Sequence, residues 1–325
     1  MVFSGKREAD AITTDFKGKH ILSLTQFSKS AIQKLFKTTD KLIIRIAKRK
    51  DVSILTRSVT TLLFFEPSTR TFTSFSSGIK KMGGETIELL NPGETSSFAK
   101  NESLQDSIRV FSTYTDLIII RHPEEGFIHK AARVSKVPVI SAGEGAGEHP
   151  TQALYDLYTI YQRHKRLSNL KILILGDARF SRSIHSLILG LTLYENNVIY
   201  LLSPMGLELS KDQERSFGKK IKLVTIKNEK EIPKDCDLWY SNRIQKERFE
   251  NLALYKKALK SFPVITTDLL KKYGNKKMII MDPLPRVGNI DEEVDKDPRA
   301  KYLTDQLENG LYIRMALVGL VSGRI

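Results

Sequence analysis

The chain has 325 residues, 41% of them hydrophobic, which is enough for two α/β domains with buried cores. Its single cysteine, Cys236, excludes a disulfide framework and a cysteine zinc cluster, and it fits a reducing compartment. The formal net charge of +15 comes largely from lysines scattered along the chain, which indicates solvated faces rather than a surface for nucleic acid or membrane.

Two features of the sequence predict a cytoplasmic protein without a membrane span. The apolar runs at residues 117–120 and 172–175 have the length of strands and are too short to cross a bilayer. Charged residues lie near the N-terminus, where the apolar segment of a secretory signal would be.

The first elements in chain order are a helix beginning at Ser28, a strand at residues 61–65 and a second helix with apolar residues from Phe72 to Met82. The polar segment Ser68-Thr69-Arg70-Thr71 stands where this strand turns into this helix. The first turn of a helix presents free N–H groups and a partial positive charge, so hydroxyls and a guanidinium there form a cradle for an anion. The structural alternative makes Ser68 an N-cap and Arg70 a solvated residue.

Strands are predicted next at residues 86–90, 117–120 and 137–140, with a polar loop at 91–101. Arg121 follows the middle one of these strands directly. Glycines at 143–147 indicate a flexible connection to a helix that opens at His149 and Gln152. Because these two residues are three apart, they share one face of that helix, which we expect to bridge two domains.

The second half repeats the alternation, with strands at residues 171–176, 198–202, 222–226, 237–240 and 278–281. Polar candidates again follow strands: Arg182, Arg243 with Gln245, and the segment Asp282-Pro283-Leu284-Pro285-Arg286. A last amphipathic helix is expected at about residues 306–321.

This order predicts an α/β fold of two doubly wound domains, each a mostly parallel sheet flanked by helices, joined by bridging helices. We expect a first domain at residues 1–148, with the C-terminal helix 305–325 packing back on it, and a second domain at residues 149–304. In such sheets ligands bind beyond the carboxyl ends of the strands, where Arg70 and Arg121 are expected.

The candidate residues are rich in anion donors and poor in nucleophiles. No two histidines have the spacing of a metal site, and neither a nucleophile elbow nor a P-loop is present. The segment from Gly176 to Ser181 lacks two glycines of a dinucleotide fingerprint. A transfer reaction between small anions, driven by positioning and charge stabilisation, fits best.

Four motifs in the expected order resemble the transcarbamoylase family over nearly the whole chain. They are Phe65-Glu66-Pro67-Ser68-Thr69-Arg70-Thr71, Arg121-His122-Pro123, His149-Pro150-Thr151-Gln152-Ala153-Leu154 and Asp282-Pro283-Leu284-Pro285-Arg286. The segment Arg243-Ile244-Gln245-Lys246-Glu247-Arg248 resembles the aspartate-binding segment of aspartate carbamoyltransferases. Ornithine carbamoyltransferases lack it and carry His-Cys-Leu-Pro at the position of residues 282–285.

The resemblance implies transfer of the carbamoyl group from carbamoyl phosphate to the amine of L-aspartate, giving N-carbamoyl-L-aspartate and phosphate in pyrimidine biosynthesis, with no cofactor and no metal. It implies that residues 1–148 bind carbamoyl phosphate and 149–304 bind aspartate. The implied carbamoyl phosphate ligands are Ser68, Thr69, Arg70, Thr71, Ser96, Lys100, Arg121, His149 and Gln152. The implied aspartate ligands are Lys100, Arg182, Arg243, Gln245, Pro283 and Leu284. The implied catalytic residues are Arg70, Thr71, Lys100, Arg121 and His149.

Ser96 and Lys100 match family residues that reach into the site of a neighbouring subunit, so the resemblance implies a homotrimer with shared active sites. Without it, the loop would be interpreted as exposed and its lysine as solvated. Two positions depart from the family: Phe72 stands where many bacterial members have arginine, and Asp282 replaces the usual histidine. We expect Asp282 to place a carboxylate near the aspartate site and so to affect the affinity for aspartate.

Two alternatives remain open. One is a transcarbamoylase with another amino-acid acceptor, and the other is a basic binding or scaffold protein that keeps the fold without the activity. The arginines and His149 of the candidate site argue against the second.

Overall fold

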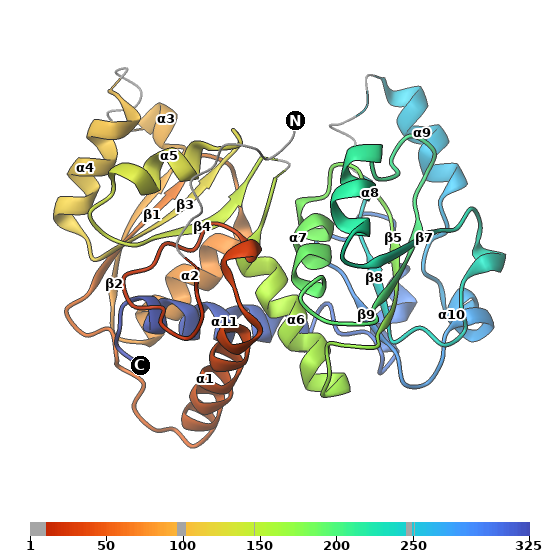
Figure 1. Ribbon diagram of the computed structural model, residues 1–325, viewed down its shortest axis with the longest axis horizontal. Coiled ribbons are helices and arrows are strands. Elements are labelled where there is room, and N and C mark those ends of the chain that lie inside the picture. The colour runs from red at the N-terminus through yellow and green to blue at the C-terminus, as the bar shows by residue number, and fades with distance from the viewer. Residues whose placement is uncertain (1–10, 96–101, 146, 245–248, 250) are drawn as a thin grey trace. The chain divides into compact units, whose positions relative to one another are not determined.

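The structure is a computed structural model that describes residues 11–95, 102–145, 147–244, 249 and 251–325. The chain forms two compact units (Figure 1). Unit 1 comprises Met1–Tyr155 and Glu308–Ile325, and unit 2 comprises Asp156–Leu307. The boundaries fall inside α6 (Pro150–His164) and α11 (Asp305–Val321), so both helices continue from one unit into the other.

Unit 1 is built on a parallel sheet with the strand order β2-β1-β3-β4. Its strands are β1 (Val59–Phe64), β2 (Glu85–Leu90), β3 (Leu117–His122) and β4 (Val139–Glu144). The central strands β1 and β3 are buried over most of their length because helices cover both of their faces. The edge strand β2 is largely exposed and carries charged residues.

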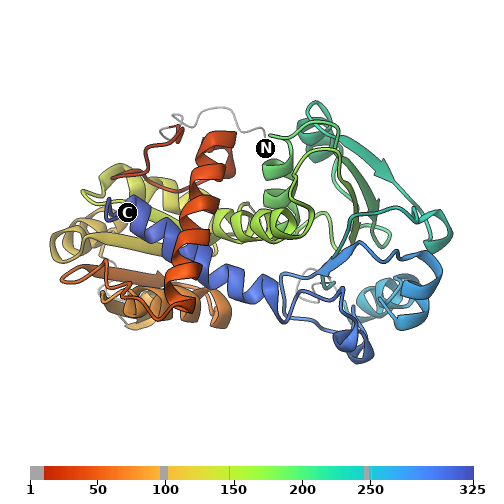
Figure 2. The same ribbon diagram turned by 90° about the horizontal axis from the view of Figure 1, so that it is seen from below.

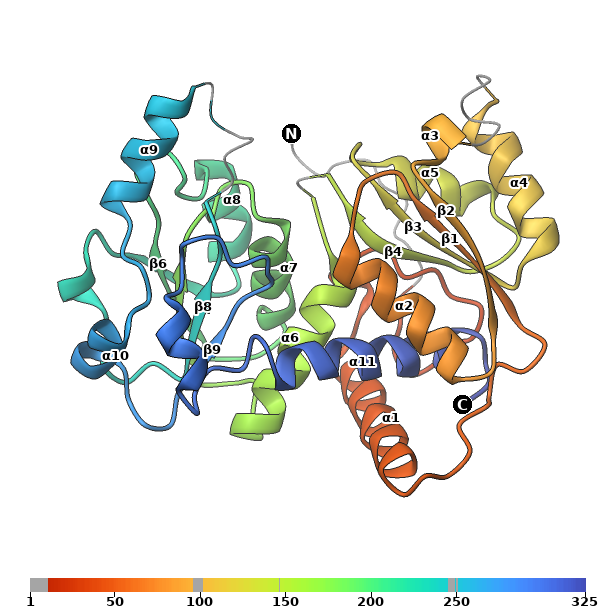
Figure 3. The same ribbon diagram turned by 180° about the vertical axis from the view of Figure 1, so that it is seen from behind.

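The helices of unit 1 lie on both faces of this sheet. They are α1 (Lys29–Ala47), α2 (Thr69–Lys81), α3 (Pro92–Thr95), α4 (Leu104–Tyr114) and α5 (Phe127–Val134), with a 3₁₀ turn at Leu24–Gln26. On one face, α4 and α5 pack Ile108 and Ile128 against Leu63, Ile118 and Ile120 of the strands. Figure 2 and Figure 3 show α1, α2 and α11 over the opposite face.

The contact between α2 and α11 is close. A Cβ atom on Gly78 of α2 would lie 2.9 Å from Cγ of Met315 in α11, so only glycine allows this approach. The C-terminal helix therefore packs on unit 1, directly against the helix that follows β1.

Unit 2 has a parallel sheet with the strand order β7-β6-β5-β8-β9. Its strands are β5 (Lys171–Leu175), β6 (Val198–Leu202), β7 (Lys222–Thr225), β8 (Leu238–Ser241) and β9 (Ile279–Met281). Its other elements are α7 (Arg182–Leu191), α8 (Lys211–Gly218), α9 (Leu252–Ser261), α10 (Thr267–Tyr273) and 3₁₀ turns at Glu229–Glu231 and Glu292–Lys296.

Both parallel sheets confirm the predicted fold class, and each strand expected from the sequence is present with ends that differ by at most four residues. The loop predicted at residues 91–101 is wrong in its first part, where α3 forms. Pro92 suits the first position of a helix, and the carbonyl of Asn91 accepts from the N–H groups of Glu94 and Thr95 at 2.9 and 3.2 Å.

The sequence pattern does not indicate α8, α9 or α10. In α8 the reason is visible, because Phe217 is its one buried residue and a single apolar side chain sets no period. No helix within the described ranges has the length and apolar character that a membrane crossing requires.

Candidate active site

The segment Ser68–Thr71 lies where β1 gives way to α2, as predicted. Ser68 is the N-cap residue of α2, yet its side chain makes no capping hydrogen bond. The capping bond of the structural alternative is therefore absent, whereas Arg70 is exposed in the first turn, as that alternative expects. The first-turn N–H groups of α2 and the hydroxyl side chains of this segment together provide donors for an anion.

His149 lies against this turn. Its Nε2 atom is 3.4 Å from Oγ1 of Thr71, and both side chains are buried. Gln152 is also buried, and its backbone N–H donates to the carbonyl of His149 at 3.0 Å. Residues from two separate motifs thus come together within unit 1, although 78 positions separate Thr71 from His149.

Arg121 comes from the neighbouring strand β3, whose carboxyl end lies beside that of β1. The N–H of Phe65 donates to the carbonyl of Arg121 at 2.9 Å, which sets the two strand ends in register. Nε of Arg121 pairs with Oε2 of Glu66 at 3.3 Å, and the arginine side chain is 13% exposed. Glu66 therefore places a negative charge beside the guanidinium at this edge of the sheet.

Arg314 of α11 contacts the first turns of α2, which carry the Ser68–Thr71 segment. This role was not predicted from the sequence. The buried guanidinium lies 5.2 Å from the ring of Phe75 and 5.1 Å from that of Tyr155, and it donates to Oγ of Ser74 at 2.8 Å. The hydroxyl of Ser74 donates to the backbone carbonyls of Arg70 and Thr71, at 2.7 and 3.0 Å. The sequence contained one signal for this role, a single arginine within the apolar run of the last helix.

The unit 2 candidates follow three adjacent strands at their carboxyl ends. Arg182 opens α7 after β5, Arg243 comes directly after β8, and Pro283 and Leu284 come after β9. The N-cap of α7 is Ser181, whose side chain accepts from the N–H of Ile184. The predicted residues Ser96, Lys100 and Gln245 lie outside the described residues.

The side chains of both departures from the family pattern have contacts within their own unit. The ring of Phe72 meets that of Phe64 edge to face, with centroids 5.3 Å apart. Asp282 is buried, and its carboxylate accepts from the N–H of Leu284 at 2.5 Å and from Nδ2 of Asn289 at 2.6 Å. This carboxylate is engaged by donors of its own unit.

His122 stacks at the same edge of unit 1. Its ring lies parallel to that of Phe127 at 3.4 Å, and Nδ1 accepts from the N–H of Glu124 at 3.0 Å. Burial lowers the pKa of His122 from its ordinary value of 6.5, and burial also lowers the pKa of His164 in unit 2. The neutral imidazole is the form that can accept at Nδ1.

The lowered pKa values of His122 and His164 predict that the protein loses stability in mild acid. A lowered pKa means that the unfolded chain binds more protons below about pH 6.5, so unfolding is favoured as pH falls through this range. We expect the free energy of unfolding in urea to fall between pH 7.5 and pH 5.5, and to fall less in His122→Gln. An equal pH dependence in both proteins would contradict this assignment.

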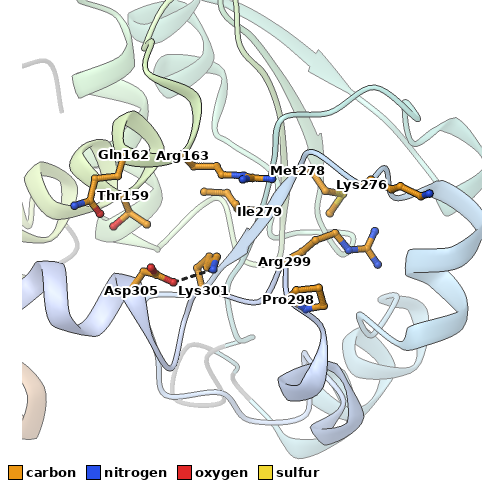
Figure 4. A pocket seen from close by; sticks show the side chains of 10 residues that line it. All are labelled: Thr159, Gln162, Arg163, Lys276, Met278, Ile279, Pro298, Arg299, Lys301 and Asp305. Atoms are coloured by element: carbon orange, nitrogen blue, oxygen red, sulfur yellow. Dashed lines mark ion pairs between the residues drawn. The ribbon is translucent and has the colours of Figure 1, made fainter.

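A hollow of about 360 Å³ in unit 2 lies at the other end of β9 (Figure 4). Its lining includes Met278 and Ile279, at the amino end of that strand. Two of its cations are already paired, Lys301 with Asp305 at 3.0 Å and Arg299 with Asp297 at 2.6 Å. The hollow is separate from the carboxyl-end group of Arg182, Arg243, Pro283 and Leu284.

No group of three or more His, Cys, Asp or Glu side chains that could hold a metal occurs in the part of the chain that the structure describes. The candidate residues at both carboxyl edges are mainly cations, hydroxyls and backbone groups. Such a set can bind anions and stabilise developing negative charge.

Two family models match the chain. The aspartate/ornithine carbamoyltransferase carbamoyl-P binding domain matches residues 19–162, and the Asp/Orn binding domain of the same family matches residues 168–321. The aspartate carbamoyltransferase catalytic subunit of Methanocaldococcus jannaschii is 39% identical over 302 residues, which cover 92% of this chain and 96% of the relative.

Two further relatives are similar over most of the chain. The multifunctional protein CAD of Squalus acanthias is 40% identical over 310 residues, which cover 95% of this chain but 14% of that much longer protein. A crystal structure of aspartate transcarbamoylase from Trypanosoma cruzi in complex with N-(phosphonacetyl)-L-aspartic acid superposes with a TM-score of 0.87 at 33% identity, covering 94% of this chain and 96% of that chain.

Proposed function

Because the chain belongs to the aspartate/ornithine carbamoyltransferase family, we propose that it transfers the carbamoyl group of carbamoyl phosphate to the amine of L-aspartate. The products are N-carbamoyl-L-aspartate and phosphate, in pyrimidine biosynthesis. The observation that carries the proposal is the anion cradle at the start of α2, where the buried Thr71 meets His149.

In this reaction unit 1 holds carbamoyl phosphate. Donors of the Ser68–Thr71 segment bind the phosphate, while Thr71, Arg121 and His149 polarise the carbonyl oxygen and Gln152 lies near the carbamoyl nitrogen. Negative charge grows on both the carbonyl oxygen and the departing phosphate, so donors aimed there act on the transition state. Correct positioning of two reactants can lower a barrier by roughly 7–11 kcal/mol.

Unit 2 holds L-aspartate. Arg182, Arg243 and Gln245 bind its two carboxylates, because guanidinium groups suit the planar geometry of a carboxylate. The backbone carbonyls of Pro283 and Leu284 accept from its amine and orient the lone pair for attack. Aspartate is favoured over ornithine because Arg182 and Arg243, which follow β5 and β8, are cationic, and the side chain of ornithine is cationic as well.

The direct test is an assay of the purified protein with carbamoyl phosphate and a panel of amino acids, reading the ureido product. Product with L-aspartate is expected. Product with ornithine and none with aspartate would favour another transcarbamoylase. No product from any acceptor, together with no binding of N-(phosphonacetyl)-L-aspartate by calorimetry, would favour a scaffold protein.

The family match at Ser96 and Lys100 leads us to propose a homotrimer in which each site takes these residues from a neighbouring subunit. Lys100→Ala and Arg70→Ala chains should each be inactive alone and regain part of the activity when mixed, dissociated and reassembled. Some sites of the mixed trimers would then combine the intact Arg70 of a Lys100→Ala chain with the intact Lys100 of an Arg70→Ala chain. Mixed trimers that are confirmed by mass spectrometry and remain inactive would contradict shared sites.

A further inference from the structure

The backbone after β9 adopts a conformation that needs support. Leu284 has φ +58°, in the left-handed region that a leucine rarely occupies. The side chain of Asp282 holds the turn, since its Oδ1 accepts from the N–H of Leu284 two residues on. The direction of the Pro283 and Leu284 carbonyls therefore depends on the carboxylate of Asp282.

Asp282 is in turn fixed by Asn289. Nδ2 of Asn289 donates to Oδ2 of Asp282 at 2.6 Å and to Oγ of Ser241 at 2.8 Å. The N–H of Val287 donates to Oδ1 of Asn289 at 2.9 Å, so the amide nitrogen must face Asp282. Asp282, Ser241 and Asn289 are all buried.

A second set of buried bonds anchors the same residue through its backbone. The N–H of Asp282 donates to Oε1 of Gln306 at 3.1 Å, and Nε2 of Gln306 donates to Oδ1 of Asp156 at 2.8 Å. The other oxygen of Asp156 accepts from the hydroxyl of Tyr240 in β8 at 2.8 Å. Side chain and backbone of Asp282 are thus both fixed from within unit 2.

The segment His122-Pro123-Glu124 of unit 1 shows what a histidine does in an equivalent sequence. There Nδ1 of His122 accepts from the N–H two residues on at 3.0 Å, as Oδ1 of Asp282 does. A histidine at position 282 could hold the turn in the same way. It could not offer a second acceptor beside the first, whereas the carboxylate of Asp282 presents Oδ2 to Asn289.

We propose that Asp282 and Asn289 are a matched positioning pair that sets the Pro283 and Leu284 carbonyls for the amine of the amino-acid substrate. Asp282 acts through these carbonyls and does not itself touch the substrate. The inference rests on the proposed transfer to L-aspartate. It assigns the unusual aspartate a function and a partner. Asn289 bonds the second carboxylate oxygen of Asp282, an acceptor that a histidine at this position would not have.

The test exchanges donor and acceptor between the two positions. In Asp282→Asn the new Oδ1 still accepts from Leu284, so its amide group is turned toward the amide of Asn289 and two donors meet. In Asn289→Asp two carboxylates meet. The double variant restores one donor and one acceptor in reverse order.

We expect each single variant to lower kcat/KM for L-aspartate by about 10- to 100-fold, since small misplacement in an active site has effects of this order. The dissociation constant for carbamoyl phosphate, measured by calorimetry, should change less than twofold, because unit 1 is untouched. The double variant should recover most of kcat/KM. Asp268→Asn, the same change at an exposed position of α10, should match the wild type.

Three outcomes would overturn the inference. One is an active wild type with an unchanged Asp282→Asn variant. Another is a double variant whose loss equals the product of the single losses. The third is a loss of carbamoyl phosphate binding and of melting temperature in parallel with the loss of kcat/KM, which indicates a purely structural role. A wild type that forms no ureido product refutes the proposed function, and the inference falls with it.

Discussion

Arg70→Ala is expected to lower kcat by about 10²–10³-fold, the usual effect of removing one well-placed donor from developing negative charge. Arg70 lies in the first turn of α2, so the change leaves the helix N-terminus and the bond between Ser74 and the backbone carbonyl at position 70 in place. Arg70→Lys should recover only part of the loss, because lysine keeps the charge without the planar fork. Steady-state formation of ureido product measures both variants.

The control for this prediction comes from the same helix. Lys81 is an exposed cation in the last turn of α2, so Lys81→Ala removes an equal charge at the other end of the helix. We expect its kcat to stay within twofold of the wild type. If Arg70→Ala behaved like Lys81→Ala, the phosphate cradle would lie elsewhere.

Gly176→Ala is expected to destabilise unit 2 by about 4 kcal/mol or more, in the range that marks a severe steric defect. Gly176 follows β5 with φ +128°, and an added Cβ would lie 2.0 Å from the carbonyl oxygen of Asn242. The oxygen that the Cβ would meet belongs to the backbone, so no flexible side chain can move aside. Because Asn242 directly precedes Arg243, a chain that still folds must also displace this candidate aspartate ligand.

Gly206→Ala separates backbone strain from collision. Gly206 also has a positive φ, +88°, but an added Cβ would meet no atom within 4 Å. Its expected loss is about 1–2 kcal/mol, the effect of the left-handed conformation alone. Urea unfolding measures the loss of unfolding free energy in both variants. Equal losses would show that the backbone at Asn242 moves away from the added Cβ at little cost.

The sequence alone was sufficient to predict the alternation of strands and helices. It also predicted that most of the candidate residues would follow the ends of strands. Buried parallel strands are continuous apolar runs, such as Leu117 to Ile120, and these are visible without any partner. The Ser68–Thr71 cluster is likewise local, since it needs only the end of one strand and the start of one helix.

The short helix α3 and the helices α8 to α10 could not be predicted in this way. Short helices with few buried residues have little periodicity, and a turn such as α3 depends on a proline and on two backbone bonds to Asn91. Weak local signals of this kind do not separate a helix from a loop.

Only the tertiary structure decided how the candidate residues are held. The contact between Thr71 and His149, the ion pair of Arg121 with Glu66 and the support of Ser74 by Arg314 join residues that are far apart in the chain. These contacts follow from strand register and helix packing, which a single sequence does not specify. The same reason applies to Asp282: the sequence shows an unusual aspartate at this position, and only the fold shows that its carboxylate is bonded to Asn289.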